Sequence, residues 1–287
     1  MIVENNVNLG KKVSFHIGGI AKNYYIPENE NELIGLVDHL NSDRETYYIL
    51  SGGSNLLIND KKVFNNIIYM GKACKEYQNY GDGIFYFGSS FRIQEIIHIV
   101  NDANYGGFEE LIGLPAMLGG IIYMNAGIGR GERELFSISK FIQKVKVLDK
   151  ISASVRWLSP SECQFGHRCS LFKSNDYVIL GAQIRLEPQM KDVSEKRIKD
   201  RMEFCKKNFE YGKGCFGTCF LQSDWHILRI VQKLNIGKTI KQADNNTNWL
   251  VNTGNGTYKD AMRIVNLTKL LHHLLFKKVE CEIIIWK

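Results

Sequence analysis

Features that mark several common classes of protein are missing from this sequence. Only 4 of its 287 residues are proline, so Pro-rich linkers are not expected. No apolar run reaches the length of a membrane span. The formal net charge is +7, but Lys and Arg are scattered and form no basic arm. We therefore expect no membrane or nucleic-acid partner, and a generic basic surface that attracts anions.

Cysteine usage argues against a disulfide framework and against a metal site. The seven cysteines are odd in number and irregularly spaced, and no signal peptide is visible. Cys215 and Cys219 are the only close pair, and no second Cys/His pair at ligand spacing accompanies them. This pattern predicts free thiols in a reducing compartment. We expect a cytoplasmic protein that binds no metal and is a monomer or weak oligomer.

Two nucleotide-binding fingerprints are also missing, since the glycines form neither a P-loop nor a GxGxxG pattern. Glycine itself is plentiful, at 26 residues, and two adjacent glycines begin the turn in SGGSNLLIND at 51–60, after the strand-like YYIL. Consecutive N–H groups in such a turn can cradle a phosphate, and Ser54 and Asn55 add side-chain donors. A tight turn with an Asn cap fits the same residues, and local spacing does not separate the two interpretations.

A longer glycine-rich run follows at residues 106–132. Its glycines include Gly113, Gly119, Gly120 and Gly127, and Pro115 is its only proline. Each glycine inside a packed helix or strand costs up to about 1 kcal/mol, so a regular packed element is not expected here. The most economical interpretation is a backbone lying against a large flat ligand. A surface loop is the alternative, although the apolar residues between the glycines argue against full exposure.

The order of predicted elements indicates an α+β fold in two lobes. In the first part, short strand-like runs alternate with helical stretches and lead into strands of an antiparallel or mixed sheet. The composition changes near Pro188, where a charged helix at 193–209 leads into a smaller α+β unit. We predict a domain of two α+β subdomains at 1–188 and a C-terminal substrate-binding domain at 189–287.

Segments in chain order resemble those of one enzyme family. They are SFHIGG at 14–19, SGGSNLLIND at 51–60, the glycine-rich run at 106–131, FGHRCSLFK at 165–173, GTCF at 217–220, NWLVNTGNGT at 248–257 and the terminal VECEI. This succession is similar to UDP-N-acetylenolpyruvoylglucosamine reductase, also called UDP-N-acetylmuramate dehydrogenase, of peptidoglycan synthesis. The resemblance implies a vanillyl-alcohol-oxidase-type (PCMH) FAD-binding lobe followed by a smaller α+β substrate-binding domain.

The same resemblance implies a cofactor and a reaction. NADPH reduces a bound FAD, and hydride then passes to C3 of the enolpyruvyl group of a nucleotide sugar. Related oxidases attach FAD covalently through a His beside the glycine turn and a Cys in the later run. Ser54 and non-Cys residues stand at those places, so we expect non-covalent FAD. The residues that the resemblance assigns to FAD are Gly52, Gly53, Ser54, Asn55, Leu56, Gly88, Gly113, Pro115, Gly119, Gly120, Met124, Asn125 and Gly127.

Three positions match the family's catalytic residues. Arg168, in FGHR, would hold the substrate carboxylate and stabilise the developing enolate; a structural salt bridge is the alternative. Thr218, in GTCF, stands where the family has the Ser that protonates C2, and it keeps the hydroxyl. Glu282, on an expected terminal strand VECEIIIW, matches the family's Glu. Glu280 would share its face of that strand and could serve chemically.

Departures from the family pattern concentrate in the substrate lobe. Leu221, Gln222 and Ser223 replace a usual Lys-Asn-Pro, which removes a cation that could meet the substrate. The other departures are Ala116 for Gly, His167 for Tyr, Asn246 for the His of Lys-His-Ala-Asn-Phe, and Cys281 for Pro. The first hypothesis is therefore reduction of UDP-N-acetylglucosamine enolpyruvate, and the second is a paralogue acting on another nucleotide sugar or related metabolite. A binding protein without turnover is a third, against which the three retained catalytic positions argue.

Overall fold

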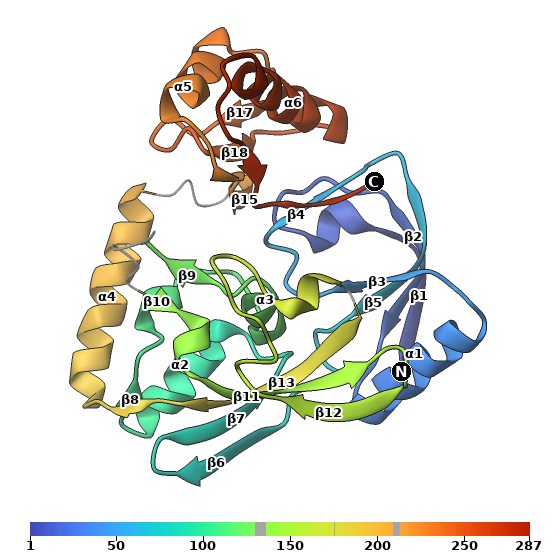
Figure 1. The fold of residues 1–287 in the computed structure, drawn as a ribbon, viewed down its shortest axis with the longest axis vertical. Coiled ribbons are helices and arrows are strands. Elements are labelled where there is room, and N and C mark those ends of the chain that lie inside the picture. Colours follow the sequence, from blue (N-terminus) through green and yellow to red (C-terminus); the bar gives the residue numbers. More distant parts are fainter. Residues whose placement is uncertain (130–135, 175, 209–212) are drawn as a thin grey trace. The chain divides into compact units, whose positions relative to one another are not determined.

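The computed structural model describes residues 1–129, 136–174, 176–208 and 213–287 (Figure 1). Contacts divide the chain into two compact units. Unit 1 contains residues 1–4, 24–52 and 66–207, and unit 2 contains residues 5–23, 53–65 and 208–287. The domain boundary at residue 188 stays a prediction, since unit 2 also takes in two segments from the N-terminal part of the chain. Portions of the glycine-rich run, of the loop before Thr218 and of the expected end of the charged helix lie outside the described residues.

The helices are of two kinds. The α-helices are α1 (Glu30–Ser42), α2 (Ile93–Asp102), α3 (Leu118–Tyr123), α4 (Lys191–Asn208), α5 (Trp225–Leu234) and α6 (Tyr258–Leu274). The 3-10 helices are η1 (Leu9–Lys12), η2 (Glu109–Leu111), η4 (Ile138–Lys140) and η5 (Leu171–Ser174). Within the described part of the chain, no helix combines the length and the apolar character needed to cross a membrane.

The strands form several separate sheets. The strands before α3 are β1 (Ile2–Asn8), β2 (Ile20–Ile26), β3 (Tyr47–Leu50), β4 (Leu56–Ile58), β5 (Val63–Tyr69), β6 (Tyr77–Gly81), β7 (Ile84–Gly88) and β8 (Tyr105–Gly106). The strands between α3 and α4 are β9 (Gly127–Ile128), β10 (Phe136–Ser137), β11 (Ile142–Asp149), β12 (Ser154–Leu158), β13 (Tyr177–Arg185) and β14 (Glu187–Pro188). The remaining strands are β15 (Gly214–Thr218), β16 (Phe220–Gln222), β17 (Ile240–Gln242), β18 (Trp249–Asn252), β19 (Glu280–Cys281) and β20 (Ile284–Trp286).

Three sheets have more than two strands among the described residues. The five-stranded sheet has the order β12-β11-β13-β7-β6 and is antiparallel throughout. The four-stranded sheet has the order β1-β2-β5-β3, and its β3 and β5 are parallel. The three-stranded sheet, β15-β18-β17, is antiparallel. The α+β character and the mixed strand directions agree with the sequence prediction.

In unit 1, the five-stranded sheet and helix α2 share one apolar core. Ile93, Ile97 and Val100 recur at helical spacing and are buried on one face of α2. Phe85 and Phe87 of β7 belong to the same cluster. Burial of each such side chain contributes about 1.5–3 kcal/mol, so this face fixes the helix on the sheet.

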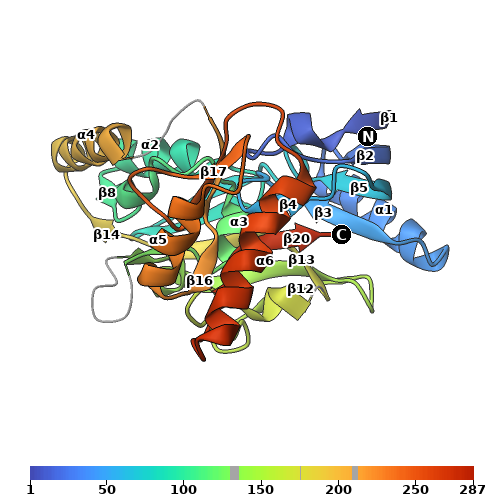
Figure 2. The same cartoon turned by 90° about the horizontal axis from the view of Figure 1, so that it is seen from above.

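In unit 2, helices α5 and α6 pack against each other (Figure 2). Asp224 begins α5, because its side chain accepts a hydrogen bond from the His226 N–H. The apolar cluster of this unit draws on residues from 216 onward and also on Phe15, Ile17 and Leu57. Segments far apart in the sequence therefore build one core.

The structure corrects the expectation that the glycine-rich run contains no regular packed element. Residues 118–123 form α3, which includes Gly119 and Gly120. A Cβ on Gly119 would lie 3.0 Å from the Cβ of Ser89. The glycine is therefore tolerated because it lets a single short helix pack with its backbone close to a neighbouring segment.

The expected single terminal strand is also wrong, because the segment is divided in two. β19 pairs antiparallel with β16, and β20 pairs parallel with β4. Between them, the N–H groups of Glu282 and Ile283 both donate to the carbonyl oxygen of Cys219, at 2.9 and 3.5 Å. The chain changes partner at this point, so Glu282 lies outside both strands and does not share a strand face with Glu280.

Candidate active site

The first two residues of the predicted glycine turn, Ser51 and Gly52, lie beside the glycine-rich run in unit 1. A Cβ on Gly52 would lie 3.2 Å from the carbonyl oxygen of Pro115, so this close approach depends on the absence of a side chain. A Cβ on Gly120 would lie 3.5 Å from the Ser51 Oγ. The structure therefore brings together Gly52, Pro115 and Gly120, which the sequence assigned to FAD from two separate motifs.

The Ser51 hydroxyl gives this region a polar group that needs a partner. Its oxygen is buried and makes no hydrogen bond to any described residue. An unsatisfied buried polar group costs about 1–3 kcal/mol, and such groups in folded proteins commonly meet a ligand or water. Gly120 leaves the space opposite this hydroxyl free of a side chain. The arrangement fits a ligand that contacts the backbone closely and offers a polar atom to Ser51.

Gly88 has a sufficient structural explanation of its own. It ends β7 opposite Gly181 of β13. A Cβ at this position would lie only 2.2 Å from the backbone oxygen of Cys74. Packing alone therefore requires glycine here, and the assignment of Gly88 to FAD remains a prediction.

Arg168 lies in a tight turn that the sequence did not predict. Gly166 and Cys169 exchange two backbone hydrogen bonds, of 2.9 and 3.1 Å, and enclose the turn. Arg168 has a φ of +52°, in the left-handed region. Its guanidinium donates to the carbonyl oxygen of Gly127 at 2.6 Å, and the Asn125 amide donates to the Gly166 carbonyl at 2.8 Å. The predicted catalytic Arg168 thus lies beside two residues predicted to bind FAD.

The side chain of Asn125 connects the end of α3 to two other segments through hydrogen bonds. It is buried, with a φ of +41°. Its Oδ1 accepts from the hydroxyl of Ser137 at 3.1 Å and from the N–H of Ser139 at 3.2 Å. Met124, which precedes it, ends α3 as its C-cap residue, and Gly113 lies in the loop between η2 and α3. Asn125 therefore serves the fold through its side chain, whatever its role toward FAD.

In unit 2, the second half of the glycine turn contacts the C-terminal segment. Gly53 has a φ of +63°, and its carbonyl oxygen accepts from the Ser14 N–H at 3.1 Å. The Asn55 side chain donates to the carbonyl oxygen of Glu282 at 3.2 Å, and the Asn55 carbonyl accepts from Ile284 at 3.1 Å. Asn55 therefore connects the motif after Ser54 to the predicted catalytic Glu282.

Thr218 and Glu282 are connected through the backbone of Cys219. The N–H of Glu282 donates to the carbonyl oxygen of Cys219, the residue after Thr218, at 2.9 Å. Both side chains are half-buried. Glu280, by contrast, is exposed and lies on β19 opposite Gln222. Glu282, which the resemblance selected over Glu280, is the carboxylate at the junction with the Thr218 segment.

Sequence reasoning did not identify Trp249 as part of the site. Trp249 is directly opposite Thr218 in the β15–β18 pair, and its indole Nε1 donates to the Thr218 Oγ1 at 3.3 Å. The preceding Asn248 holds Phe220 through two hydrogen bonds, of 2.9 and 2.8 Å, to the Phe220 backbone. The signal available in the sequence was the Trp that replaces Phe in the Lys-His-Ala-Asn-Phe pattern.

The thiol nearest the junction in sequence is a poor proton donor or nucleophile. Cys219 is fully buried, and this burial raises the pKa of its thiol well above the ordinary value. Groups of three or more His, Cys, Asp or Glu that could hold a metal ion do not occur among the described residues. Thr218 and Glu282 are the two predicted catalytic side chains at this junction.

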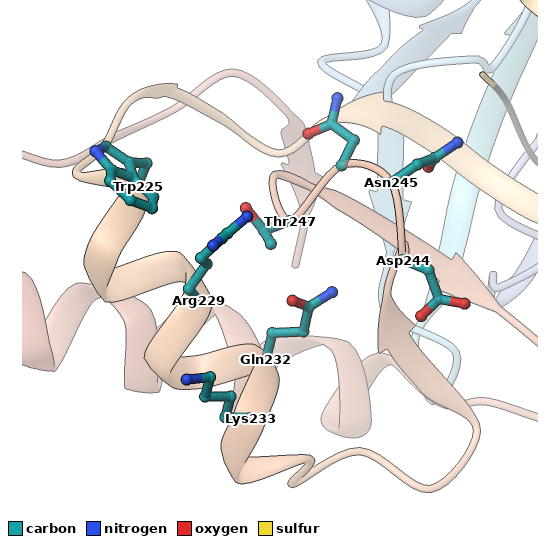
Figure 3. Close-up of a pocket in the computed structure, with 8 residues that line it drawn as sticks. Trp225, Arg229, Gln232, Lys233, Asp244, Asn245 and Thr247 are labelled. Atoms are coloured by element: carbon teal, nitrogen blue, oxygen red, sulfur yellow. The ribbon is translucent and has the colours of Figure 1, made fainter.

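A surface pocket of about 390 Å³ lies beside α5 in unit 2 (Figure 3). Its lining residues are Trp225, Arg229, Gln232, Lys233, Asp244, Asn245, Asn246 and Thr247. Arg229 and Lys233 are four residues apart on one helix and therefore neighbours, and the Arg229 guanidinium lies 5.2 Å from the Trp225 ring centre. Figure 3 shows Arg229 extending toward Thr247. Two cations and an aromatic ring suit an anionic ligand that has a flat group.

The structure is an α+β fold, as the sequence predicts, and it is similar to solved structures. The solved structure of Phl p 4, a grass pollen allergen with glucose dehydrogenase activity, has a TM-score of 0.50 and 13% identity; the match covers 65% of this chain and 41% of that one. UDP-N-acetylenolpyruvylglucosamine reductase from Thermus caldophilus has a TM-score of 0.78 and 22% identity, and the match covers 100% of both chains.

Curated relatives extend the likeness to the sequence. UDP-N-acetylenolpyruvoylglucosamine reductase from Clostridium kluyveri (strain NBRC 12016) is 28% identical over 263 residues, which cover 89% of this chain and 83% of the relative. The reductase of the same name from Bacillus pumilus (strain SAFR-032) is 24% identical over 269 residues, covering 92% and 86%. No protein-family model matches the chain. The resemblance predicted from the order of motifs is confirmed, and the chain is related to these reductases over most of its length.

Proposed function

We propose that this chain is a cytoplasmic flavoenzyme of peptidoglycan synthesis that reduces UDP-N-acetylglucosamine enolpyruvate to UDP-N-acetylmuramate with NADPH. The observation that carries the proposal is the junction at Glu282. There the peptide groups of Cys219 and Glu282 and the side chain of Asn55 are joined by hydrogen bonds of 2.9 and 3.2 Å. One cofactor motif and two catalytic motifs therefore meet within a single unit.

The residues present fit FAD. The glycine turn, with Ser54 and Asn55 as donors, and the run from Gly113 to Gly127 would hold it, and the unpartnered Ser51 hydroxyl supports a ligand there. Bound FAD supplies hydride transfer from NADPH to C3 of the enolpyruvyl group. No His stands at Ser54, so the attachment is non-covalent.

The chain's own residues hold the substrate and move the proton. Arg168 binds the substrate carboxylate and stabilises the negative charge that develops on it. Thr218 donates its hydroxyl proton to C2, and Glu282 polarises the enolpyruvyl group or assists proton delivery. The cations of the pocket beside α5, Arg229 and Lys233, suit the diphosphate of a nucleotide sugar, and Trp225 offers its base a ring to stack on.

The test is NADPH oxidation by the purified FAD-loaded protein, with and without UDP-N-acetylglucosamine enolpyruvate. We expect rapid turnover only with this substrate. In stopped-flow measurements, Thr218→Ala should keep flavin reduction by NADPH and lose reoxidation by the substrate, whereas Thr218→Ser should keep both. An unimpaired Thr218→Ala variant would exclude Thr218 as the acid.

A second candidate function is supported by Leu221, Gln222 and Ser223, which stand where the family has Lys-Asn-Pro. The missing Lys changes the charge offered to the substrate. A paralogue acting on another nucleotide sugar or related metabolite would show rapid flavin reduction by NADPH without reoxidation by UDP-N-acetylglucosamine enolpyruvate. The same stopped-flow experiment therefore separates the two functions.

A further inference from the structure

Trp249, the residue opposite the proposed proton donor Thr218, can donate a hydrogen bond from its indole N–H. Trp249 begins β18, Thr218 ends β15, and the two residues are cross-strand partners. The Trp249 indole N–H donates to the Thr218 Oγ1 at 3.3 Å. A Phe, which the family pattern has at this position, would fill similar space but has no donor.

The backbone on both sides keeps this pair in register. The register shift between Cys215 and Thr218, with Gly217 at a φ of +79°, bends β15 just before the hydroxyl. Beyond it, the Cys219 N–H donates to the Asn248 carbonyl at 2.8 Å. The hydrogen bond from the indole therefore joins two strands that are already fixed to each other, and it costs little additional ordering.

The hydrogen bond has two chemical consequences for the hydroxyl. A threonine oxygen carries one proton and two lone pairs, so an oxygen that accepts from the indole must direct its own proton elsewhere. When that proton leaves, negative charge develops on Oγ1, and a positioned N–H stabilises this charge. The branched Cβ of Thr218 restricts χ1, which limits the directions the oxygen can take.

We infer that Trp249 is a positioning residue for proton transfer by Thr218. The indole N–H holds Oγ1 with its proton directed away from the indole. In the step itself, the O–H bond of Thr218 breaks, the proton forms a C–H bond at C2 with the electron pair of the enolate, and the N–H stabilises the oxygen until solvent returns a proton. The inference rests on the proposed function, because it needs Thr218 as the acid.

The hydrogen bond is tested first without turnover. The ¹H–¹⁵N spectrum of the FAD-loaded protein should contain four indole signals, one for each Trp. The signal that disappears in Trp249→Phe belongs to Trp249, and it should move and exchange faster with solvent in Thr218→Val. The signals of Trp157, Trp225 and Trp286 should stay in place and serve as internal references. If the chemical shift and the solvent exchange of the Trp249 signal are unchanged in Thr218→Val, the inference is overturned.

The role in proton transfer is tested by stopped-flow kinetics. In Trp249→Phe, reoxidation of the reduced flavin by UDP-N-acetylglucosamine enolpyruvate should slow by roughly tenfold, with a larger solvent deuterium isotope effect. Flavin reduction by NADPH should change by less than about twofold. Trp157→Phe, which alters an exposed ring on β12, is the matched control and should leave both steps unchanged. A purely structural role would slow both steps or raise only the KM, without an effect on the isotope ratio.

Coupling between the two residues completes the test. In a Thr218→Val background, Trp249→Phe should not change the residual, slow rate of flavin reoxidation any further, because the hydroxyl it orients is gone. Additive effects would overturn the inference. Failure of the proposed function is seen separately, as a wild-type protein that this substrate does not reoxidise; that result removes the inference as well. Failure of the inference alone leaves the wild type active and appears only in the variants.

Discussion

Arg168 has a backbone conformation that few residues other than glycine adopt, and its surroundings hold it there. Its φ of +52° costs of the order of 1 kcal/mol for a residue with a side chain. The two hydrogen bonds between Gly166 and Cys169 enclose the turn, and the guanidinium bond to Gly127 directs the side chain. The charge is therefore oriented before a substrate binds, which is the condition under which such a group contributes most to stabilising developing negative charge.

We expect Arg168→Lys to reduce kcat/KM for UDP-N-acetylglucosamine enolpyruvate by about 10²–10³-fold, corresponding to roughly 3–4 kcal/mol. Lysine keeps the charge but lacks the planar fork that binds a carboxylate through two hydrogen bonds. FAD content and the rate of flavin reduction by NADPH should be close to those of the wild type. Steady-state kinetics and stopped-flow spectroscopy measure these quantities.

His167 provides the control, because it lies in the same turn and is exposed. His167→Ala should change kcat/KM by less than about threefold, within the range usual for surface substitutions. If the Arg168→Lys variant has the wild-type kcat/KM, Arg168 has no role in substrate binding, and its role is structural, through the hydrogen bond to Gly127. Loss of FAD in this variant would instead assign Arg168 to cofactor binding.

At the scale of elements, the C-terminal segment depends in part on a strand from early in the sequence. β20 pairs with β4, and β19 pairs with β16. The core of unit 2 includes Phe15, Ile17 and Leu57, all buried. The predicted domain boundary at residue 188 would separate these residues from the helices and strands they pack against.

We expect a fragment of residues 189–287 not to fold on its own. The loss of three buried side chains removes about 5–9 kcal/mol, which is comparable with the whole stability of an ordinary domain. The fragment also lacks β4, so the edge of β20 loses its partner. Circular dichroism during thermal unfolding should show no cooperative transition. The matched control adds residues 5–23 and 53–65 through flexible linkers and should restore it; a cooperative transition in the short fragment would support the boundary at 188.

Local periodicity predicted those elements whose own residues determine them. The spacing of Ile93, Ile97 and Val100 is typical of an amphipathic helix, and the apolar run at 177–185 is typical of a strand; the structure has α2 and β13 at these places. The prediction that the glycine-rich run contains no regular packed element was wrong at α3. There, Gly119 lets a short helix pack close to Ser89. The division of VECEIIIW depends on which strand each half meets, and a sequence pattern does not contain that information.

In the candidate site too, local motifs predicted single residues, whereas contacts between distant segments were not predicted. The motifs supplied Arg168, Thr218 and Glu282 one by one, because their neighbours in the chain are characteristic. The resemblance selected Glu282 over Glu280, whereas the change of strand partner at Cys219, which separates the two residues, was not predicted. The contribution of Trp249 required the register of β15 and β18, which is a property of tertiary pairing.

At the scale of the whole molecule, a non-covalent cofactor contributes to stability through mass action. A ligand that binds only the folded protein stabilises it by about 2.7 kcal/mol at a free concentration 100 times its Kd. We therefore expect the thermal midpoint of the apoprotein to rise with FAD concentration. Acid precipitation should leave all the flavin in the supernatant. Flavin that remains with the precipitate would contradict the absence of a covalent link at Ser54.

Ser51→Ala separates the stability of the protein from its affinity for FAD. The Ser51 hydroxyl has no partner among the described residues, so its removal should leave the unfolding free energy of the apoprotein unchanged or higher. If FAD supplies the missing partner, the Kd measured by titration of the apoprotein should rise by up to roughly tenfold. Ser137→Ala is the matched control: its hydroxyl already donates to the buried Asn125, so the apoprotein should lose about 1–3 kcal/mol. An unchanged Kd for Ser51→Ala would place the flavin away from this hydroxyl, because the free energy of a hydrogen bond to the cofactor appears only when the cofactor is bound.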